Sequence, residues 1–291
     1  MLIREELKSY DFSSAEAVAV DYILSKPDQI DHLTIKELAE MTFTQPSTIV
    51  RIAKKLGYSG WVDFKRAYLA EHRYLVSNFT TVDANFPFTS KDNIMTIAKK
   101  VSSLEKSTID DLVSLLHHDQ LAKSRQLLIE ASHIYVFGQN ANILIAQDFA
   151  LKMRRIGKFV SLVTTTGEEL YEAYNLPQTA CAILISYSGE TNLVLSVNRI
   201  LKSRGVKTLA ITSIGNNTLS KEASLFLPIT TREKFYSKIA NFTTNISMTV
   251  LLDILYSLVF SKKYDDNMAH LKTTGEVVDN RKSSTGIMSE N

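Results

Sequence analysis

The sequence predicts two architectures in one chain: an all-α domain followed by an α/β domain whose parallel sheet is flanked by helices. A length of 291 residues corresponds to about two ordinary domains, and 45% apolar content is enough for two cores. Only two of the ten glycines precede residue 138. From residue 13 to 130 the pattern is mostly helical, whereas from 133 to 229 short β-prone runs alternate with amphipathic helical stretches.

The first domain is expected to contain four helices. The first covers residues 13–24 and stops before Lys26-Pro27. The second covers 34–41, where Thr34 and Glu37 are spaced as a capping box. The third runs from Pro46, a favoured first helical residue, to Gly57, a favoured terminator. The fourth runs from 61 to about 77.

A linker and a connecting helix are expected next. Residues 79–90 contain no Lys or Arg and no clear period, which is typical of a linker. A near-heptad apolar stripe then predicts a helix that packs against either the second domain or a partner subunit. The stripe consists of Ile94, Ile97, Val101, Leu104, Thr108, Leu112 and Leu115. We expect domain boundaries at 1–77, 78–119 and 120–262, with 263–291 as a flexible tail that is frayed from Thr273 on.

The second domain is expected to be a parallel sheet covered by helices. Strands are predicted at 133–138, 159–163, 180–185, 206–211 and 225–229, with helices between them, such as 192–204. Ligands of such sheets bind beyond the carboxyl ends of the strands. The loops that follow the strands are therefore the candidate binding segments.

The second and third helices have the length and spacing of a helix-turn-helix. Placed 100° apart, the residues of the third helix sort into two faces. The apolar face holds Ile49, Ile52, Ala53 and Leu56, and the opposite face holds Ser47, Thr48, Arg51, Lys54 and Lys55. Hydroxyls and cations of this kind bond to phosphates, and Arg also bonds to guanine.

Charge supports a nucleic-acid partner only when it is divided along the chain. The total is +2, but residues 1–50 carry −5 and residues 51–73 carry +4. Positive charge is thus concentrated on the third and fourth helices. Charged helix faces are often merely solvated, so this pattern alone leaves DNA binding undecided.

The third strand ends in Ser186-Tyr187-Ser188-Gly189-Glu190-Thr191, directly before a helix. We predict an anion site here from three features: hydroxyl donors, a glycine that permits close backbone approach, and the unpaired N–H groups at the start of a helix. Ordinary capping of that helix by Ser188 is the alternative.

The run from Ser47 to Lys65, STIVRIAKKLGYSGWVDFK, resembles the N-terminal domain of RpiR-type bacterial transcriptional regulators over about residues 10–75. The resemblance implies DNA contacts from Thr44, Gln45, Ser47, Thr48, Arg51, Lys54 and Lys55. Where the family often has a Ser before the recognition helix, this chain has Gln45-Pro46. We therefore expect the cap role to pass to Thr44 or Gln45.

The loop at 186–191 resembles the phosphate-binding signature of SIS (sugar isomerase) domains, and the similarity extends over about residues 120–260. By this resemblance, Ser186, Ser188 and Thr191, with the backbone N–H groups of Tyr187 and Gly189, hold a sugar phosphate. The first loop departs from the common Gly-x-Gly-x-Ser, because Gly138 is followed by Asn140 and Asn142. We expect a retained phosphate pocket and an unusual sugar end.

The resemblance implies a transcriptional regulator of carbohydrate metabolism, with operator DNA and a phosphorylated sugar as partners and a homodimer or homotetramer as the assembly. The alternative is an aldose-ketose sugar-phosphate isomerase with a helical oligomerisation arm. No histidine is expected at the carboxyl ends of the strands to act as its base, although Glu168 and Glu169 follow the second strand. A protein that serves only for oligomerisation is disfavoured by the basic face of the third helix. Lys238 and Ser237, at the start of the last helix of the second domain, are minor candidates for ligand contact.

No cofactor, metal site or catalytic residue is expected, because the histidines are scattered and the one cysteine, Cys181, lies in an apolar strand. The first eight residues lack the apolar stretch of a signal peptide. The most apolar run, residues 246–260, is shorter than a membrane span. We therefore expect a cytoplasmic protein with no membrane partner. The sequence leaves open which sugar is the effector, which operator is bound and whether the protein represses or activates.

Overall fold

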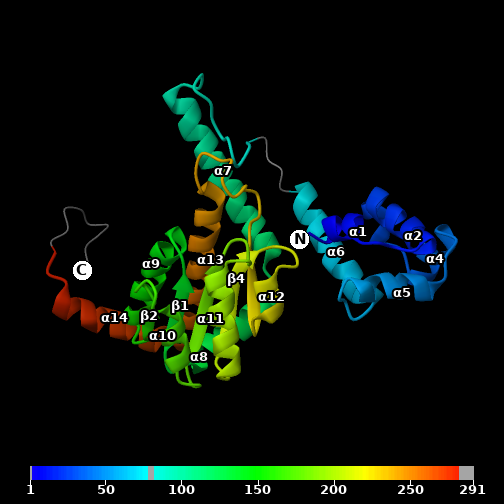
Figure 1. Cartoon of the computed structure of the whole chain (residues 1–291). Coiled ribbons are helices and arrows are strands. Elements are labelled where there is room, and N and C mark those ends of the chain that lie inside the picture. The colour runs from blue at the N-terminus through cyan, green and yellow to red at the C-terminus, as the bar shows by residue number, and fades with distance from the viewer. Residues whose placement is uncertain (1, 78–81, 282–291) are drawn as a thin grey trace.

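The computed structural model describes residues 2–77 and 82–281, and it divides into a helical domain and a βα domain (Figure 1). The two domains meet where the Nδ2 atom of Asn216 donates to the carboxylate of Glu6 at 2.8 Å. The helices of the first domain are α1 (Ile3–Ser9), α2 (Ser14–Ser25), α3 (Pro27–Ile30), α4 (Ile35–Met41), α5 (Pro46–Lys55) and α6 (Trp61–Ser77). The expectation of four helices is therefore wrong, because α1 and α3, of seven and four residues, are too short to give a clear helical period in the sequence.

Local sequence signals explain where these helices begin. The predicted capping box of α4 is confirmed, because the Thr34 N–H donates to the Glu37 carboxylate at 2.7 Å and the Glu37 N–H donates to the Thr34 hydroxyl at 3.3 Å. The predicted apolar face of α5 is also confirmed, since Ile49, Ile52 and Ala53 are buried. This face anchors α5 in the core of the helical domain.

The βα domain contains one five-stranded sheet in the order β2-β1-β3-β4-β5, and every pair of neighbouring strands is parallel. Its strands are β1 (Ile134–Gly138), β2 (Val160–Leu162), β3 (Cys181–Ser186), β4 (Lys207–Ser213) and β5 (Leu225–Ile229). All six residues of β3 are buried. Because the chain leaves β1 toward β2 on one side and reaches β3 on the other, a crevice is expected at the carboxyl ends of β1 and β3.

Helices cover both faces of this sheet, which confirms the predicted fold class. One face packs on α7 (Ile94–Leu115), α8 (His118–Glu130), α9 (Ala141–Arg155) and α13 (Phe242–Phe260). The other face packs on α10 (Glu169–Asn175), α11 (Asn192–Ser203) and α12 (Thr218–Glu222). The domain therefore has three layers, with the sheet between two layers of helices and one apolar core on each face of the sheet.

The apolar stripe of α7 is divided between two environments. Leu104, Thr108 and Leu112 are fully buried, whereas Ile94 is 85% exposed. The carboxyl-terminal half of α7 packs against α13, and the amino-terminal half extends beyond the sheet (Figure 1). Of the two expectations for the stripe, packing against the second domain applies to its carboxyl-terminal half.

The expectation of a frayed tail is wrong for residues 273–278. A short 3-10 helix, η1 (Ser261–Lys263), leads into α14 (Tyr264–Val278), none of whose residues is buried. Residues 279–281 follow α14 without helical structure, and residues 282–291 lie outside the described residues. The expected domain boundary at 119/120 also falls inside α8, which begins at His118.

The expectation that the apolar run is shorter than a membrane span is wrong, because the helical run 242–278 that contains it is long and apolar enough to cross a membrane by length and composition. Its first part, α13, belongs to the core of the βα domain, where Met248, Leu251 and Leu255 are fully buried. An apolar helix is expected in such a position, because it is surrounded by other elements of a folded domain.

Replacing Leu104 by Ala is expected to lower the free energy of unfolding by about 2–5 kcal/mol, because it leaves a cavity at a fully buried position of α7. Urea unfolding followed by circular dichroism measures the change. Ile94→Ala on the same stripe is the matched control and is expected to cost less than about 0.5 kcal/mol at its exposed position. Equal losses in the two variants would contradict the assigned packing of α7.

Candidate functional site

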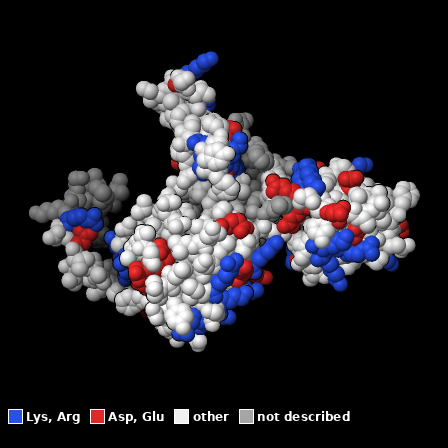
Figure 2. Space-filling model, viewed as in Figure 1, with Lys and Arg blue, Asp and Glu red and all other residues white. Residues whose placement is uncertain are grey.

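The outer face of α5 presents basic and hydroxyl groups to solvent. Ser47, Arg51 and Lys54 are exposed, and Figure 2 shows Lys and Arg side chains gathered over the part of the helical domain that holds α5. Thr48 is 6% exposed, so its expected position on this face is wrong. The 100° spacing placed Thr48 near the boundary between the two faces, and packing against neighbouring helices covers it.

Two cations of this face are bound to a buried carboxylate. Glu16 of α2 is 1% exposed and accepts from Arg51 Nε at 2.8 Å and from Lys55 Nζ at 2.7 Å. Burial alone would raise the pKa of Glu16, but hydrogen bonds from Lys55, Ser13 and Arg51 outweigh it and lower the pKa to about 2. Lys55 therefore serves mainly to hold α5 on α2, while the Arg51 side chain remains 58% exposed.

The turn before α5 differs from the expected capping. Gln45 is the N-cap residue but makes no side-chain cap bond, and the Thr44 hydroxyl instead lies 2.9 Å from that of Thr42. Sequence reasoning missed Phe43, which has a φ of +52° and is 98% exposed. Turns of this motif often contain glycine, so an aromatic residue inside the turn was the available signal.

The two predicted ligand loops meet at the carboxyl edge of the sheet. Gly138 at the end of β1 pairs with Ile185 of β3, one residue before Ser186. A Cβ at Gly138 would lie 3.5 Å from both the Asn142 and Ile185 side chains. Loops 138–142 and 186–191 are thus adjacent, as the strand order requires.

The serine and threonine hydroxyls of loop 186–191 bond within the loop. The Ser186 hydroxyl lies 2.8 Å from that of Thr191 and accepts from the Gly189 N–H at 3.1 Å. The Ser188 hydroxyl accepts from the Glu190 N–H at 3.1 Å. Thr191 is the N-cap residue of α11 and makes no side-chain cap bond. Capping of α11 by Ser188 is therefore not the arrangement observed.

Backbone conformation restricts both loops. Gly189 has a φ of +68°, and a Cβ there would lie 2.0 Å from Asn217 Oδ1, so only glycine fits. Asn140, the N-cap residue of α9, has a φ of +54° although it carries a side chain. Where glycine would be unstrained, asparagine stores strain in the first loop.

Of the remaining acid candidates, Glu169 and Glu190 have structural partners, whereas Glu168 is the exposed N-cap residue of α10 and makes no side-chain cap bond. Glu169 accepts from the Gly167 N–H at 2.8 Å, and Glu190 accepts from the Thr218 N–H at 2.8 Å. Burial raises the pKa of the Cys181 thiol to about 12. Among the residues that the structure describes, no histidine lies in a loop at the carboxyl ends of the strands and no group of His, Cys, Asp or Glu forms a metal site.

Comparison with known proteins matches both halves of the chain. A model of the rpiR-family helix-turn-helix domain matches residues 2–72, and an SIS-domain model matches residues 127–258. The uncharacterized HTH-type transcriptional regulator TTE0211 of Caldanaerobacter subterraneus is 30% identical over 281 residues, which cover 97% of each chain.

Two solved structures share the fold. Vibrio vulnificus NanR complexed with ManNAc-6P is 24% identical, covers 94% of this chain and 97% of its own, and has a TM-score of 0.58. The sugar isomerase domain of an RpiR transcription factor from Sphaerobacter thermophilus is 16% identical, covers 62% of this chain and 98% of its own, and has a TM-score of 0.55.

The pKa of Glu16 makes a prediction about acid stability. Because its pKa falls from 4.5 to about 2 on folding, Glu16 contributes stability above pH 4.5 that is lost as the pH falls toward 2. Glu16→Gln is expected to lower the melting temperature at neutral pH and to reduce its loss between about pH 5 and pH 3. Thermal unfolding across this range measures both effects. Glu40→Gln, at an exposed position on α4, is the control, and an identical acid profile for all three proteins would contradict the role of Glu16.

Proposed function

Because the chain belongs to the RpiR family of helix-turn-helix transcriptional regulators with an SIS domain, we propose that it binds operator DNA through α5 and that a phosphorylated sugar in the SIS domain controls this binding. The observation that carries the proposal is the presence, in one chain, of an exposed basic face on α5 and a glycine-containing hydroxyl loop at the sheet edge. NanR, which shares the fold, was solved with ManNAc-6P, and this supports a phosphosugar as the effector class.

Arg51 is the proposed base-reading residue of α5. Its guanidinium is fixed by Glu16 through Nε while most of the side chain stays exposed, and such a held fork suits the paired acceptors of guanine in the major groove. Lys54 and Ser47 are proposed phosphate contacts, and Thr44 and Gln45 lie at the amino-terminal end of the same helix. Thr48 and Lys55 are assigned to packing.

The sugar phosphate is proposed to bind at loop 186–191. Its serine and threonine hydroxyls bond to one another or to the Gly189 and Glu190 N–H groups, so an incoming phosphate would exchange these internal bonds for bonds to its own oxygens. Gly138, Asn140 and Asn142 of the adjacent loop are the proposed contacts to the sugar. The side-chain amide of Asn142 can donate to and accept from sugar hydroxyls, which favours a ligand rich in them.

We propose that the regulator acts on genes of carbohydrate metabolism, in the cytoplasm, as a homodimer or homotetramer. Two-fold assemblies match operators with two half-sites about one helical turn apart. A sugar phosphate is the natural signal for such genes, because it reports the presence of their substrate.

An isomerase activity is the second candidate, since the fold is shared with a sugar isomerase domain. It needs a base near the sugar. Glu169 and Glu190 already accept backbone hydrogen bonds, which leaves Glu168, an exposed residue at the start of α10, as the candidate base. Incubation of the purified protein with hexose and pentose phosphates tests this directly. Turnover would support the isomerase and would count against a purely regulatory role.

The proposed regulator requires sequence-preferring DNA binding. The purified protein is expected to bind DNA from upstream of its own gene at least about 10³-fold more tightly than bulk DNA at physiological salt. Equal affinity for both DNAs would contradict the proposal.

Replacing Arg51 by Ala is expected to weaken binding to the upstream DNA by about 10- to 100-fold through loss of a base contact, with sugar-phosphate binding unchanged. Lys54→Ala, on the same face, is expected instead to weaken binding to all sequences and to lower the salt slope by about 1. Fluorescence anisotropy at several salt concentrations separates these effects. An unchanged affinity of both variants would remove α5 as the reading helix.

The ligand cradle is tested by thermal shift with a panel of phosphorylated sugars, including ManNAc-6P, and their unphosphorylated forms. Binding at a large excess over Kd is expected to raise the melting temperature by several degrees. Ser188→Ala is expected to abolish this shift because it removes a phosphate donor. Ser203→Ala, at the far end of α11, is the control, and a shift retained in Ser188→Ala would place the site elsewhere.

A further inference from the structure

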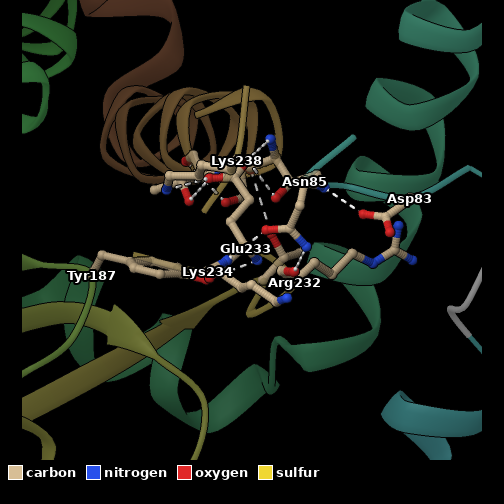
Figure 3. A network of polar contacts seen from close by, with 11 residues as sticks. Asp83, Asn85, Tyr187, Arg232, Glu233, Lys234 and Lys238 are labelled. Carbon is tan, nitrogen blue, oxygen red and sulfur yellow. Dashed lines mark hydrogen bonds and ion pairs between the residues drawn. The ribbon is translucent and has the colours of Figure 1, made fainter. Parts of the chain in front are cut away.

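Tyr187, the second residue of the ligand loop, is attached to a different loop of the domain (Figure 3). Its hydroxyl donates to the Glu233 carbonyl at 2.8 Å and accepts from the Glu233 N–H at 3.1 Å. Lys238 Nζ lies 5.6 Å from the centre of the Tyr187 ring. The Phe235 ring packs edge-on against the same tyrosine ring, with 6.3 Å between the two ring centres. The segment 230–241 between β5 and α13, here called the β5–α13 loop, thus holds the side chain of the ligand loop.

The β5–α13 loop is itself held firmly at Glu233. The buried Glu233 carboxylate accepts from the Thr243 N–H at 2.5 Å, from the Thr244 hydroxyl at 2.7 Å and from Lys238 at 3.2 Å. These bonds cap the amino terminus of α13 with a negative charge, which the helix dipole favours. The Glu233 peptide is therefore placed by the core helix of the domain.

The same peptide is also bonded to the segment that follows the helical domain. Asn85 accepts from the Lys234 N–H through Oδ1 at 2.7 Å and donates to the Arg232 carbonyl through Nδ2 at 3.3 Å. Its own carbonyl accepts from the Ile239 N–H at 2.9 Å. Asn85 thus forms hydrogen bonds to the β5–α13 loop on both sides of Glu233, as Figure 3 shows.

Further contacts connect this junction to α7 and to the segment that follows α6. Asn85 is 9% exposed, and its N–H donates to Asp83 at 2.7 Å. The Arg232 guanidinium forms a buried ion pair with Asp111 of α7 and donates to Ser107 at 3.1 Å. Asn85 follows the last residue of α6, Ser77, by only eight positions in the sequence.

From this geometry we infer that Asn85 is the positioning residue that couples the ligand loop to the DNA-binding domain, with the Glu233 peptide as the shared link. This inference rests on the proposed function. When the ligand loop exchanges its internal hydrogen bonds for bonds to a phosphate, Tyr187 shifts with it. The Glu233 peptide and Asn85 must then move with Tyr187 or lose their hydrogen bonds. Either change alters how Asn85, in the segment that connects the two domains, is held.

The coupling is measured as the ratio of DNA affinities with and without the panel sugar phosphate that gives the largest thermal shift. A ratio of roughly 5- to 150-fold is expected for the unmodified protein. Asn85→Ala is expected to reduce this ratio to within about twofold while each ligand alone binds within about threefold of its original affinity. Asn175→Ala, which removes an amide that donates to the Tyr171 carbonyl within α10, is the control and should keep the full ratio. Full coupling in Asn85→Ala would overturn the inference.

A second variant and a second measurement keep the test independent of folding and of the sugar. Asn85→Asp retains the acceptor for Lys234 but loses the donor to Arg232, so an intermediate ratio is expected. Hydrogen exchange at the Lys234 and Ile239 amides, which donate to Asn85, is expected to speed up several-fold in Tyr187→Phe and to change when inorganic phosphate is added to the unmodified protein. Unchanged exchange in Tyr187→Phe would overturn the inference.

These readouts separate the two proposals. If the unmodified protein prefers no DNA sequence, the proposed function fails, whatever the exchange data show. If it binds DNA but no panel sugar phosphate changes the affinity, control by a sugar phosphate fails and hydrogen exchange alone decides the link through Asn85. If control is present and Asn85→Ala retains it, only the coupling inference fails.

Discussion

The buried central strand β3 is the constraint on which the rest of the βα domain depends. All six of its residues are covered by helices and neighbouring strands, so the chain can meet solvent and ligand only after the strand ends at Ser186. The neighbouring strand β1 ends in register with it, which brings the first and third loops together. Binding chemistry is therefore concentrated at one edge of the sheet, where backbone N–H groups and hydroxyls have no ladder partners.

Buried carboxylates organise both domains in a similar way. Glu16 holds α5 against α2 through Arg51 and Lys55, and Glu233 holds the β5–α13 loop against the start of α13. Each acid is almost completely buried and satisfied by several donors, so removing one partner leaves a costly unpaired charge. Such junctions favour a single geometry, which suits surfaces that must present groups to DNA or transmit a shift between loops.

Two residues with strained backbone conformations lie beside the proposed DNA-binding helix and the proposed ligand loop. Phe43 and Asn140 both adopt a positive φ, one in the turn before α5 and the other in the first ligand loop. The sequence pattern identified Asn140 as a departure from glycine, because a family signature marked that position. Phe43 was missed because apolar residues in short segments are usually assigned to the core, and only the folded turn shows that it is 98% exposed.

The sequence by itself determined the fold class, the family and the longer helices and strands up to residue 260, because helical and strand periods, caps and glycine positions are local signals that survive without tertiary context. It also placed the ligand loop, since that loop directly follows a buried strand. Tertiary structure alone decided that Thr48 is buried, that Lys55 pairs with Glu16 and that Asn85 bonds to the β5–α13 loop. The partners in each pair lie 39 and 149 residues apart, and no local pattern encodes which distant groups packing will bring into contact.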